Sequence, residues 1–458
     1  MPSELVEWLL VRHPKPTNKG ALKVSVSSPS LKSIKVVFDD QNLVANAGLI
    51  LVSTMSENLV LEKLIDERVS LSGRVGGANP GRKILTIVHA MAAGANYIDH
   101  VDMLKSGSTK AVLGHEVMAP STIGIFLRAF SFGHIRQLDS AIDTALSRAW
   151  QLGAGPGDNQ LVIDIDSTIC EVHGSKKQGA NFGYTKCRCY HPLLAVRADT
   201  GEILHARLRK GSANTSRGVK QFIAETIARV RRAGANGEIV IRFDSGYWSN
   251  ATLVQLEKLD VRYSMAIRAG TKGIKGIIEA IDEDAWSEIP YTPDGEAQVA
   301  ETIYQNRRLV VRRTRLIGKQ AELWPSWRYF GFLTDLSGTT VEADQFQRNR
   351  AVIELCIRDI KESSLEHLPS GNFSANGVWL ACAVLAHNLL RWSATLGKVT
   401  AKGTFLTSKT MRTRFISIAA RLVNASGRLV LRGPKHWPWA QQFLSLLSNL
   451  RSIQPATG

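Results

Sequence analysis

The stretch LVIDIDSTICEVHG, residues 161–174, determines how the rest of the chain is interpreted. Its first six residues, Leu161 to Asp166, are apolar and partly β-branched and have turn-forming neighbours, a pattern that predicts a buried strand. Side chains alternate between the faces of a strand, so Asp164 and Asp166 share one face, opposite the isoleucines. A buried carboxylate is unfavourable unless it is paired. The stretch alone leaves open whether these aspartates cap a turn or perform chemistry.

The composition indicates a large basic globular protein. The chain has 458 residues, enough for two to four domains, and 44% of them are hydrophobic. Lys and Arg number 57 against 40 for Asp and Glu, which gives a formal net charge of +17. Such an excess favours a polyanionic partner, most often nucleic acid, although a ribosome-like or merely basic protein has the same balance.

We expect a cytoplasmic protein with no membrane partner. Glu4 and Glu7 interrupt the first apolar residues, so no signal peptide is predicted. The longest apolar run, Val378 to Trp392, contains His387 and Arg391 and is expected to be too short and too polar to span a bilayer. Five cysteines, an odd number in a large chain, fit a reducing compartment better than a disulfide framework.

Helical periodicity dominates the region from Thr54 to Gln151. Within it, Thr109 to Phe130 predicts a helix, a turn and a second helix, with Ser121 or Thr122 as the second N-cap. A helix-turn-helix places such a second helix in the major groove of DNA. An ordinary helical hairpin in a bundle explains the pattern equally well. The stretch Ala154 to Asp158 then predicts a linker.

The residues after the first strand predict an α/β unit. A hairpin, a helix, a strand, a helix and a strand follow in that order: Leu193 to Arg197 with Glu202 to Leu208, Ser216 to Ala233, Ile239 to Phe243, Asn250 to Leu259, and Val261 to Ile267. Asp244 follows the fourth strand directly. This order, with one aspartate on the first strand and another at the end of the fourth, resembles a ribonuclease H-like core, a mixed sheet with flanking helices.

Residues 282–335 predict a β-rich insertion, with Trp324 and Trp327 in the motif LWPSWR. Helical patterns return at Asp344 to Lys361 and at Ala375 to Ala394. We therefore divide the chain into a mainly helical N-terminal DNA-binding domain (1–155), the first part of the core (156–281), the insertion (282–335), the completion of the core (336–395) and a basic C-terminal region for dimerisation or DNA contact (396–458).

Three carboxylates stand where phosphoryl-transfer chemistry needs them. Two divalent ions roughly 3.5–4 Å apart can activate an oxygen nucleophile and stabilise the leaving oxygen, and Mg²⁺ prefers oxygen ligands. Asp166 and Asp244 are two candidates, and the third is on the helix predicted for 347–361. There one stripe holds residues spaced four, four and three apart: Arg350, Glu354, Arg358 and Lys361. A solvated salt-bridge face is the commoner use of such a stripe, but its position after two core aspartates favours catalysis.

These motifs together resemble the DDE transposases of bacterial insertion sequences. The resemblance spans Gly81 to Trp392 and is closest to the group whose glutamate helix reads Tyr-x2-Arg-x3-Glu-x6-Lys and whose core holds a β-rich insertion. It is carried by LVIDIDSTICEVHG, by YHPLL at 190–194, by RFDSGYWSN at 242–250 and by the helix stripe. Gln347 stands where this group has its tyrosine, with Phe346 beside it.

The resemblance implies a mechanism and its catalytic residues. Asp166, Asp244 and Glu354 would bind two Mg²⁺ per active site, with Mn²⁺ able to substitute. Asp164 would not bind the metal itself but would support the site from the same face of the strand. Hydrolysis at the element's terminal inverted repeat would free a 3′-OH, which would attack target DNA. Families of this type often pass through a hairpin intermediate. A homodimer on double-stranded DNA, associated with the nucleoid, follows from the need to bring two ends together.

The resemblance also implies DNA contacts. Arg350, Arg358 and Lys361 would hold phosphates near the cut, contacts that position DNA without reading its sequence. Trp324 or Trp327 would stack on a flipped base, an interaction worth ~1–3 kcal/mol. A buried tryptophan of a β-core is at least as good an interpretation of either one.

Three rival functions remain open at this point. A ribonuclease H-like nuclease or resolvase would share the metal chemistry without strand transfer, and a degenerate element product would bind DNA ends without catalysis. A zinc-dependent DNA-binding protein without catalysis would need a structural zinc site made of four of the clustered residues Cys170, His173, Cys187, Cys189 and His191, but their spacing matches no common zinc module.

Overall fold

The computed structural model describes residues 31–183, 186–268, 270–292, 294–317, 327–401 and 404–456. The described residues belong to two units: residues 31–40 lie in the first unit, and residues 41–456 form the second, compact unit. The described part of the first unit contains a 3₁₀ turn at Leu31–Ser33. All remaining elements belong to the second unit.

A nine-stranded mixed sheet forms the centre of the second unit, in the order β10-β11-β12-β13-β9-β8-β2-β6-β7. The predicted strands of the α/β unit are confirmed as β2 (Leu161–Ser167), β6 (Leu193–Arg197), β7 (Ile203–Arg207), β8 (Ile239–Phe243) and β9 (Arg262–Ile267). β2 pairs antiparallel with β6 and parallel with β8, and β8 pairs parallel with β9. The two predicted crossover helices are confirmed as α7 (Val219–Ala233) and α8 (Asn250–Lys258).

The β-rich segment continues this sheet. Its described strands are β10 (Ser287–Ile289), β11 (Gly295–Tyr304), β12 (Arg307–Leu316) and β13 (Arg328–Thr334). β13 pairs antiparallel with β9, where Gly331 lies opposite Ile267. Without that pairing β9 would present a row of unpaired backbone groups at a sheet edge. Helix α9 (Ile274–Glu279) lies in the connection between β9 and β10.

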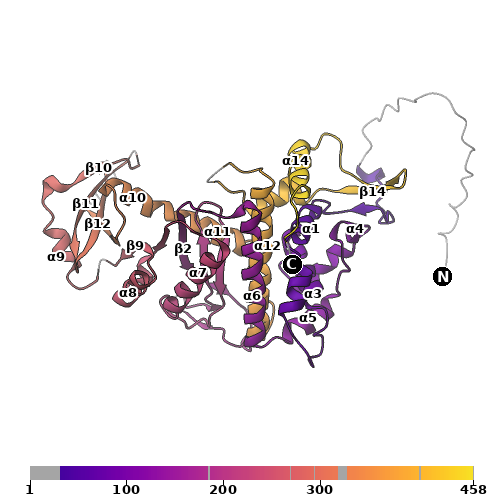
Figure 1. Ribbon diagram of the computed structural model, residues 1–458, viewed down its shortest axis with the longest axis horizontal. Coiled ribbons are helices and arrows are strands. Elements are labelled where there is room, and N and C mark those ends of the chain that lie inside the picture. Colours follow the sequence, from indigo (N-terminus) through magenta and orange to yellow (C-terminus); the bar gives the residue numbers. More distant parts are fainter. Residues whose placement is uncertain are drawn as a thin grey trace, which may run out of the picture. The chain divides into compact units, whose positions relative to one another are not determined.

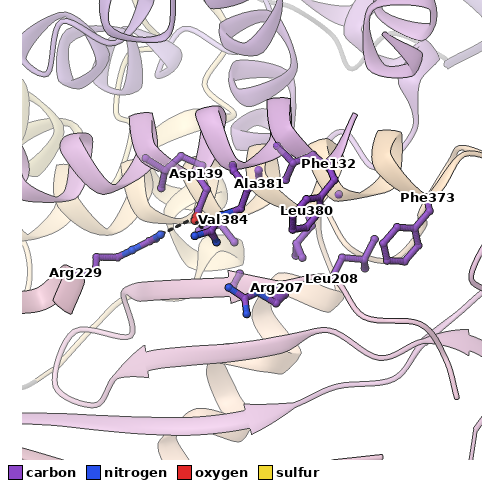
Figure 2. A pocket seen from close by; sticks show the side chains of 14 residues that line it. Phe132, Asp139, Arg207, Leu208, Arg229, Phe373, Leu380, Ala381 and Val384 are labelled. Atoms are coloured by element: carbon purple, nitrogen blue, oxygen red, sulfur yellow. Dashed lines mark hydrogen bonds and ion pairs between the residues drawn. The ribbon is translucent and has the colours of Figure 1, made fainter. Parts of the chain in front are cut away.

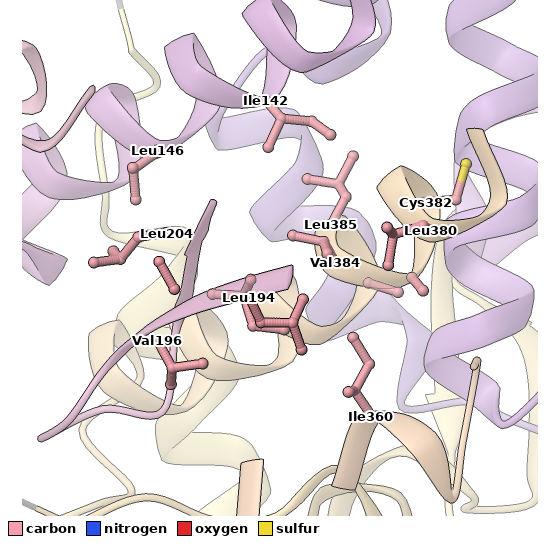
Figure 3. Packing of buried hydrophobic residues seen from close by; sticks show 14 of the residues in the cluster. Ile142, Leu146, Leu194, Val196, Leu204, Ile360, Leu380, Cys382, Val384 and Leu385 are labelled. Atoms are coloured by element: carbon pink, nitrogen blue, oxygen red, sulfur yellow. The ribbon is translucent and has the colours of Figure 1, made fainter. Parts of the chain in front are cut away.

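Helix α12 (Phe373–Leu396) is the central core helix, and it contacts the sheet strand β7 as well as the N-terminal helices (Figure 1). By length and composition α12 is apolar enough to cross a membrane, so the expectation that this run is too short and too polar was wrong. Its most apolar 18-residue window has a mean hydropathy of 1.3, and 83% of that window is buried inside the protein. Figure 3 shows Leu380, Val384 and Leu385 of α12 among the apolar side chains of the helices and the sheet.

The N-terminal helices are α1 (Leu49–Asn58), α2 (Leu61–Arg68), α3 (Pro80–Ala93), α4 (Thr109–Leu113), α5 (Pro120–Arg128) and α6 (Phe132–Ala149). Helices α1, α3, α5 and α6 contact α12, whereas α2 packs against α1, α3 and α6, and α4 packs against α1. The helix, turn and helix predicted at 109–130 correspond to α4 and α5. The predicted N-cap at Ser121 or Thr122 was wrong: α5 begins at Pro120 with Ala119 as N-cap, because proline lacks the N–H that the first turn cannot use.

The C-terminal elements pack against the first elements of the second unit. β14 (Ala420–Ala425) pairs with β15 (Arg428–Arg432) and with the short strand β1 (Leu43–Val44), and α14 (Ala440–Arg451) contacts α1 and α12. The remaining named elements are β3 (Cys170–Glu171), β4 (Asn181–Phe182), β5 (Arg188–Tyr190), α10 (Thr340–Arg348), α11 (Val352–Lys361) and α13 (Ser408–Met411).

Candidate active site

Asp166 and Asp244 meet at one edge of the sheet. In the parallel pair of β2 and β8, Ile165 lies opposite Phe243. Asp166 and Asp244 are the next residues on these two strands, so their backbones leave the sheet side by side. Parallel strands of an open sheet characteristically present functional side chains at their carboxyl ends.

Backbone amides hold both carboxylates. Asp166 Oδ1 accepts a hydrogen bond from its neighbour Ser167 N at 2.7 Å, and Asp244 Oδ1 accepts one from Gly246 N at 2.8 Å. A Cβ at Gly246 would lie 2.9 Å from the side chain of Thr215 and 3.0 Å from Asp244 Oδ1. Glycine therefore lets the turn after β8 wrap closely around the Asp244 carboxylate.

Arg350 is the cation of this site. Its Nη2 donates to Asp166 Oδ2 at 2.8 Å and to the carbonyl of Ile165 at 3.2 Å, and its side chain is only 12% exposed. Burial raises the pKa of Asp166, Arg350 opposes that rise, and the charge of Asp244 adds to it. The effect of the Asp244 charge on Asp166 shows that the two carboxylates lie in one electrostatic environment.

Asp164 serves a different purpose from Asp166. It is completely buried, and its two oxygens accept from Arg242 Nε at 2.7 Å and Arg242 Nη2 at 2.8 Å. Arg242 Nη1 also donates to the carbonyl of Phe346 at 2.7 Å, close to the end of α10. The Asp164–Arg242 pair thus joins two strands of the sheet to the segment that carries Arg350.

Two residues that the sequence interpretation did not assign support the same corner. Gln347 accepts from Ser264 Oγ at 2.6 Å and donates to the carbonyl of Phe243 at 3.2 Å, so it ties α10 to β9 and to the end of β8, directly before Asp244. Tyr247 is fully buried, and burial raises its pKa, with the charges of Asp166 and Asp244 adding to the effect. Two features of the sequence could have pointed to these residues: Gln347 stands where the resembling group has a tyrosine, and Tyr247 is an aromatic residue within DSGYW.

The predicted helix stripe is divided between two elements. α10 ends at Arg348, a 3₁₀ turn covers Asn349–Ala351, and α11 begins at Val352. Arg350 therefore turns toward Asp166, whereas Glu354 and Arg358 are exposed on α11, and Lys361 is partly exposed at its end. In the described ranges, no three acidic, histidine or cysteine side chains lie close enough to hold one metal ion. The structure thus brings together Asp166, Asp244 and Arg350 but not Glu354.

Of the two candidate base-stacking tryptophans, the structure describes Trp327. Trp324 lies outside the described residues. The ring of Trp327 is partly exposed and has the guanidinium carbons of Arg313 and Arg315 at 4.6 Å and 4.4 Å from its centroid. Such cation–π contacts stabilise the β-rich segment on their own.

A cleft of about 680 Å³ opens beside Asp244. Its lining combines the loop of residues 211–216, four of which have small polar side chains, with the rings of Phe182 and Trp248 and with Arg268. Arg209 Nη1 donates to backbone carbonyls of this loop, including Asn214 at 3.2 Å. The loop's shape is therefore fixed, and polar and aromatic side chains face the space next to the carboxylate.

A second cavity, shown in Figure 2, lies between α6, β7 and α12. It is small, about 80 Å³, and mostly apolar, and the ion pair of Arg229 with Asp139 at 2.7 Å borders it. It contains no pair of carboxylates, so the cleft beside Asp244 is the better candidate for a substrate.

The clustered cysteines and histidines show ordinary packing in the part of the chain that is described. Cys170 and Cys189 are buried, and burial raises the pKa of Cys170 to about 12, which disfavours the thiolate that zinc needs. His191 Nδ1 bonds to the carbonyl of Ala213 at 2.8 Å. With no three-ligand group described among them, these residues give no support to a zinc site.

The family model described as "Transposase DDE domain group 1" matches residues 26–455. Among solved structures, the chain is similar to a piggyBac transposase in a synaptic complex with hairpin DNA, with 11% identity, a TM-score of 0.46, and coverage of 90% of this chain and 82% of that one. No curated protein sequence matches the chain. Because the family model covers most of its length, this protein belongs to the transposase family with a DDE domain, group 1.

Proposed function

We propose that this transposase cleaves the ends of its element and joins the freed 3′-OH to target DNA. The observation that carries the proposal is that Asp166 and Asp244 lie close together at the carboxyl ends of adjacent parallel strands. The strands β7-β6-β2-β8-β9, with two crossover helices, would form its ribonuclease H-like core, and the strands β10 to β13 its insertion.

The donor set suits a hard divalent cation. Asp166 and Asp244 offer carboxylate oxygens from a single edge, which is the chemistry that Mg²⁺ prefers and Mn²⁺ tolerates. When bound, two such ions would supply charge stabilisation for the attacking and leaving oxygens of an in-line displacement. Glu354 is one helical turn beyond Arg350, on a helix that contacts β2, and we propose that it completes the ligand set once DNA is bound.

The chain's own cations and aromatic rings would position the DNA. Arg350 opposes the rise that burial causes in the pKa of Asp166, and Arg358 and Lys361 would contact phosphates from α11. The cleft beside Asp244 would receive the strand next to the cut, with rings available for stacking. Asp164 would maintain the corner through Arg242. We further propose that two chains assemble on the two element ends, in the cytoplasm at the nucleoid.

A strand-transfer assay tests the proposal. The protein is incubated with labelled element-end DNA, Mg²⁺ and a target plasmid, and the products are resolved on a denaturing gel. The proposal predicts cleavage at the end and a joined product. Nicking without joining would instead establish a nuclease or resolvase, and binding without cleavage would establish a non-catalytic DNA-binding protein.

A further inference from the structure

The small sheet of β1, β14 and β15 has one buried face and one exposed face. Val44 is completely buried, and Leu422 and Leu431 pack against the hydrophobic core. Because side chains alternate along a strand, the residues between them point outward. We call this outward set the arginine face, and it consists of Arg421, Val423, Arg428, Val430 and Arg432.

Positive charge on the arginine face is concentrated by the register of the hairpin. Arg421 lies directly opposite Arg432, a like-charge pair that destabilises an isolated sheet. The last acidic residue of the whole chain is Glu366, and eleven Lys and Arg residues follow it. No ion pair is described for Arg428 or Arg432 in the ranges that the structure covers, so their charge is available to a partner.

The hairpin also has the shape of a protruding ribbon. Its turn consists of Ser426 and Gly427, with φ values of 51° and 77°. Two consecutive positive φ values are typical of a two-residue type I′ turn, which matches the twist of paired strands. The tip is consequently narrow, and Leu429 beside it is 70% exposed. A two-stranded ribbon of this kind fits the major groove, which is about 12 Å wide.

From these observations we propose that the arginine face binds the phosphate backbone of double-stranded DNA, as a contact separate from the Asp166–Asp244 site. In Figure 1, β14 and β2 lie on opposite sides of α12. The choice of DNA rests on the proposed function, since a transposase must hold long stretches of its element or target. Guanidinium groups bind phosphates with paired hydrogen bonds, which makes arginine well suited to this contact.

A second copy of the chain fits this face poorly. Symmetric contact between two arginine faces would place arginine against arginine, and antiparallel pairing of two β15 edges would bring Arg428 near the partner copy's Arg432. Charge complementarity therefore selects a polyanion and disfavours self-association through this surface.

The test uses the full-length protein with three substitutions, Arg421→Gln, Arg428→Gln and Arg432→Gln. Its control carries Lys63→Gln, Arg262→Gln and Lys275→Gln, which remove equal charge from exposed residues that already pair with acids. Affinity for a 40-base-pair duplex of random sequence is measured by fluorescence anisotropy without divalent cations, from about 50 to 200 mM salt. Thermal melting checks that both variants are folded.

The proposal predicts binding at least about tenfold weaker for the arginine variant and a salt slope lower by about three, since each lost phosphate contact removes roughly 0.9. The control variant should match the wild type. Unchanged affinity and slope would overturn the proposal. It would also be overturned if the substitutions instead abolished binding to anionic phosphatidylglycerol vesicles or changed the oligomeric state. Because this assay needs no catalysis, a wild type that binds DNA but never cleaves it would reject the proposed function and leave this surface intact.

Discussion

Asp164 and Asp166 are indistinguishable by strand periodicity, because both lie on the same face of β2. Their surroundings separate them: Asp164 is held by both nitrogens of a buried arginine, whereas Asp166 shares its environment with Asp244 and Arg350. No local sequence signal encodes the Arg242 contact, since it joins residues 78 positions apart. The sequence pattern puts both aspartates on one strand, and only the fold shows which of them is the buried partner of Arg242.

This difference predicts that substitutions at Asp164 and Asp166 affect stability unequally. Asp164→Ala should lower the free energy of unfolding by about 3–5 kcal/mol, because it leaves the buried charge of Arg242 without its partner. Asp166→Asn should change it little, since burial already disfavours the Asp166 carboxylate and Arg350 keeps other acids nearby. Urea denaturation measures both. Equal losses for the two variants would show that both aspartates are structural.

Arg350 predicts a shift in pH dependence. Its positive charge favours the ionised form of Asp166, so Arg350→Gln should raise the pKa of Asp166 further. Metal binding needs the ionised carboxylate, and the acid limb of the cleavage rate should therefore move to higher pH. Single-turnover rates at saturating DNA give the profile.

Arg358→Gln is the control for this shift. Arg358 lies on the same predicted stripe but is exposed on α11. It should weaken DNA binding and leave the acid limb in place. An acid limb that stays fixed in the Arg350 variant would show that Asp166 does not limit the rate.

At the scale of elements, the break between α10 and α11 is the main departure from the sequence interpretation. Residues 347–361 carry an unbroken helical pattern, yet a 3₁₀ turn at Asn349–Ala351 divides them. Arg242 binds the carbonyls of Phe346 and Asn349 at this point, so a long-range contact competes with continuous helix. The pairing of the β-rich segment with β9 is likewise a long-range contact, and no local sequence pattern predicts it.

Asp359 anchors helix α11 to its neighbours, so we expect its removal to destabilise the protein. The carboxylate accepts from Ser408 N, at 2.8 Å to Oδ2, and from Arg391 Nη2 at 2.9 Å. Asp359→Ala would leave Arg391 buried without its partner and should lower the free energy of unfolding by about 3–5 kcal/mol. Glu362→Gln, an exposed change one residue beyond the same helix, should have no measurable effect in the same denaturation experiment. Equal stability of both variants would refute this anchoring.

At the scale of the whole molecule, buried histidines predict how stability depends on pH. Burial lowers the pKa of His387 to about 4, and it lowers those of His89 and His205 well below the ordinary value. A group with a depressed pKa stays neutral in the folded state while the unfolded chain takes up a proton. For His387 the resulting stabilisation of the folded state is present above pH 6.5 and is lost as the pH falls, by about 2 kcal/mol at pH 5.

Burial raises the pKa of Asp164 and Glu202, and these acids change the pH dependence of stability in the opposite sense to the histidines. The test therefore compares the wild type with a histidine variant at two pH values, so that the effect of the acids is common to both proteins. Between pH 7 and pH 5, His387→Gln should lose about 2 kcal/mol less unfolding free energy than the wild type. Equal losses in the two proteins would mean that His387 is already charged in the folded state.

Long-range organisation was the part least accessible from the sequence. The N-terminal and C-terminal segments were predicted as separate regions, yet β1 pairs with β14 and α14 packs on α1. A strand of two residues is too short to show alternation of apolar and polar side chains, so residues 43–44 do not predict the pairing of β1 with β14. The charge imbalance and the order of the core elements, by contrast, were readable because they depend only on composition and local periodicity.

The most direct test of the central claim compares four single substitutions in the end-cleavage assay with Mg²⁺. Asp166→Asn, Asp244→Asn and Glu354→Gln should each reduce the single-turnover rate by about 10³-fold or more, corresponding to a loss of at least about 4 kcal/mol of transition-state stabilisation. DNA affinity should stay within about twofold of the wild type, and Glu362→Gln should cleave normally. Wild-type cleavage by the Asp166 or Asp244 variant would contradict the assignment of this site.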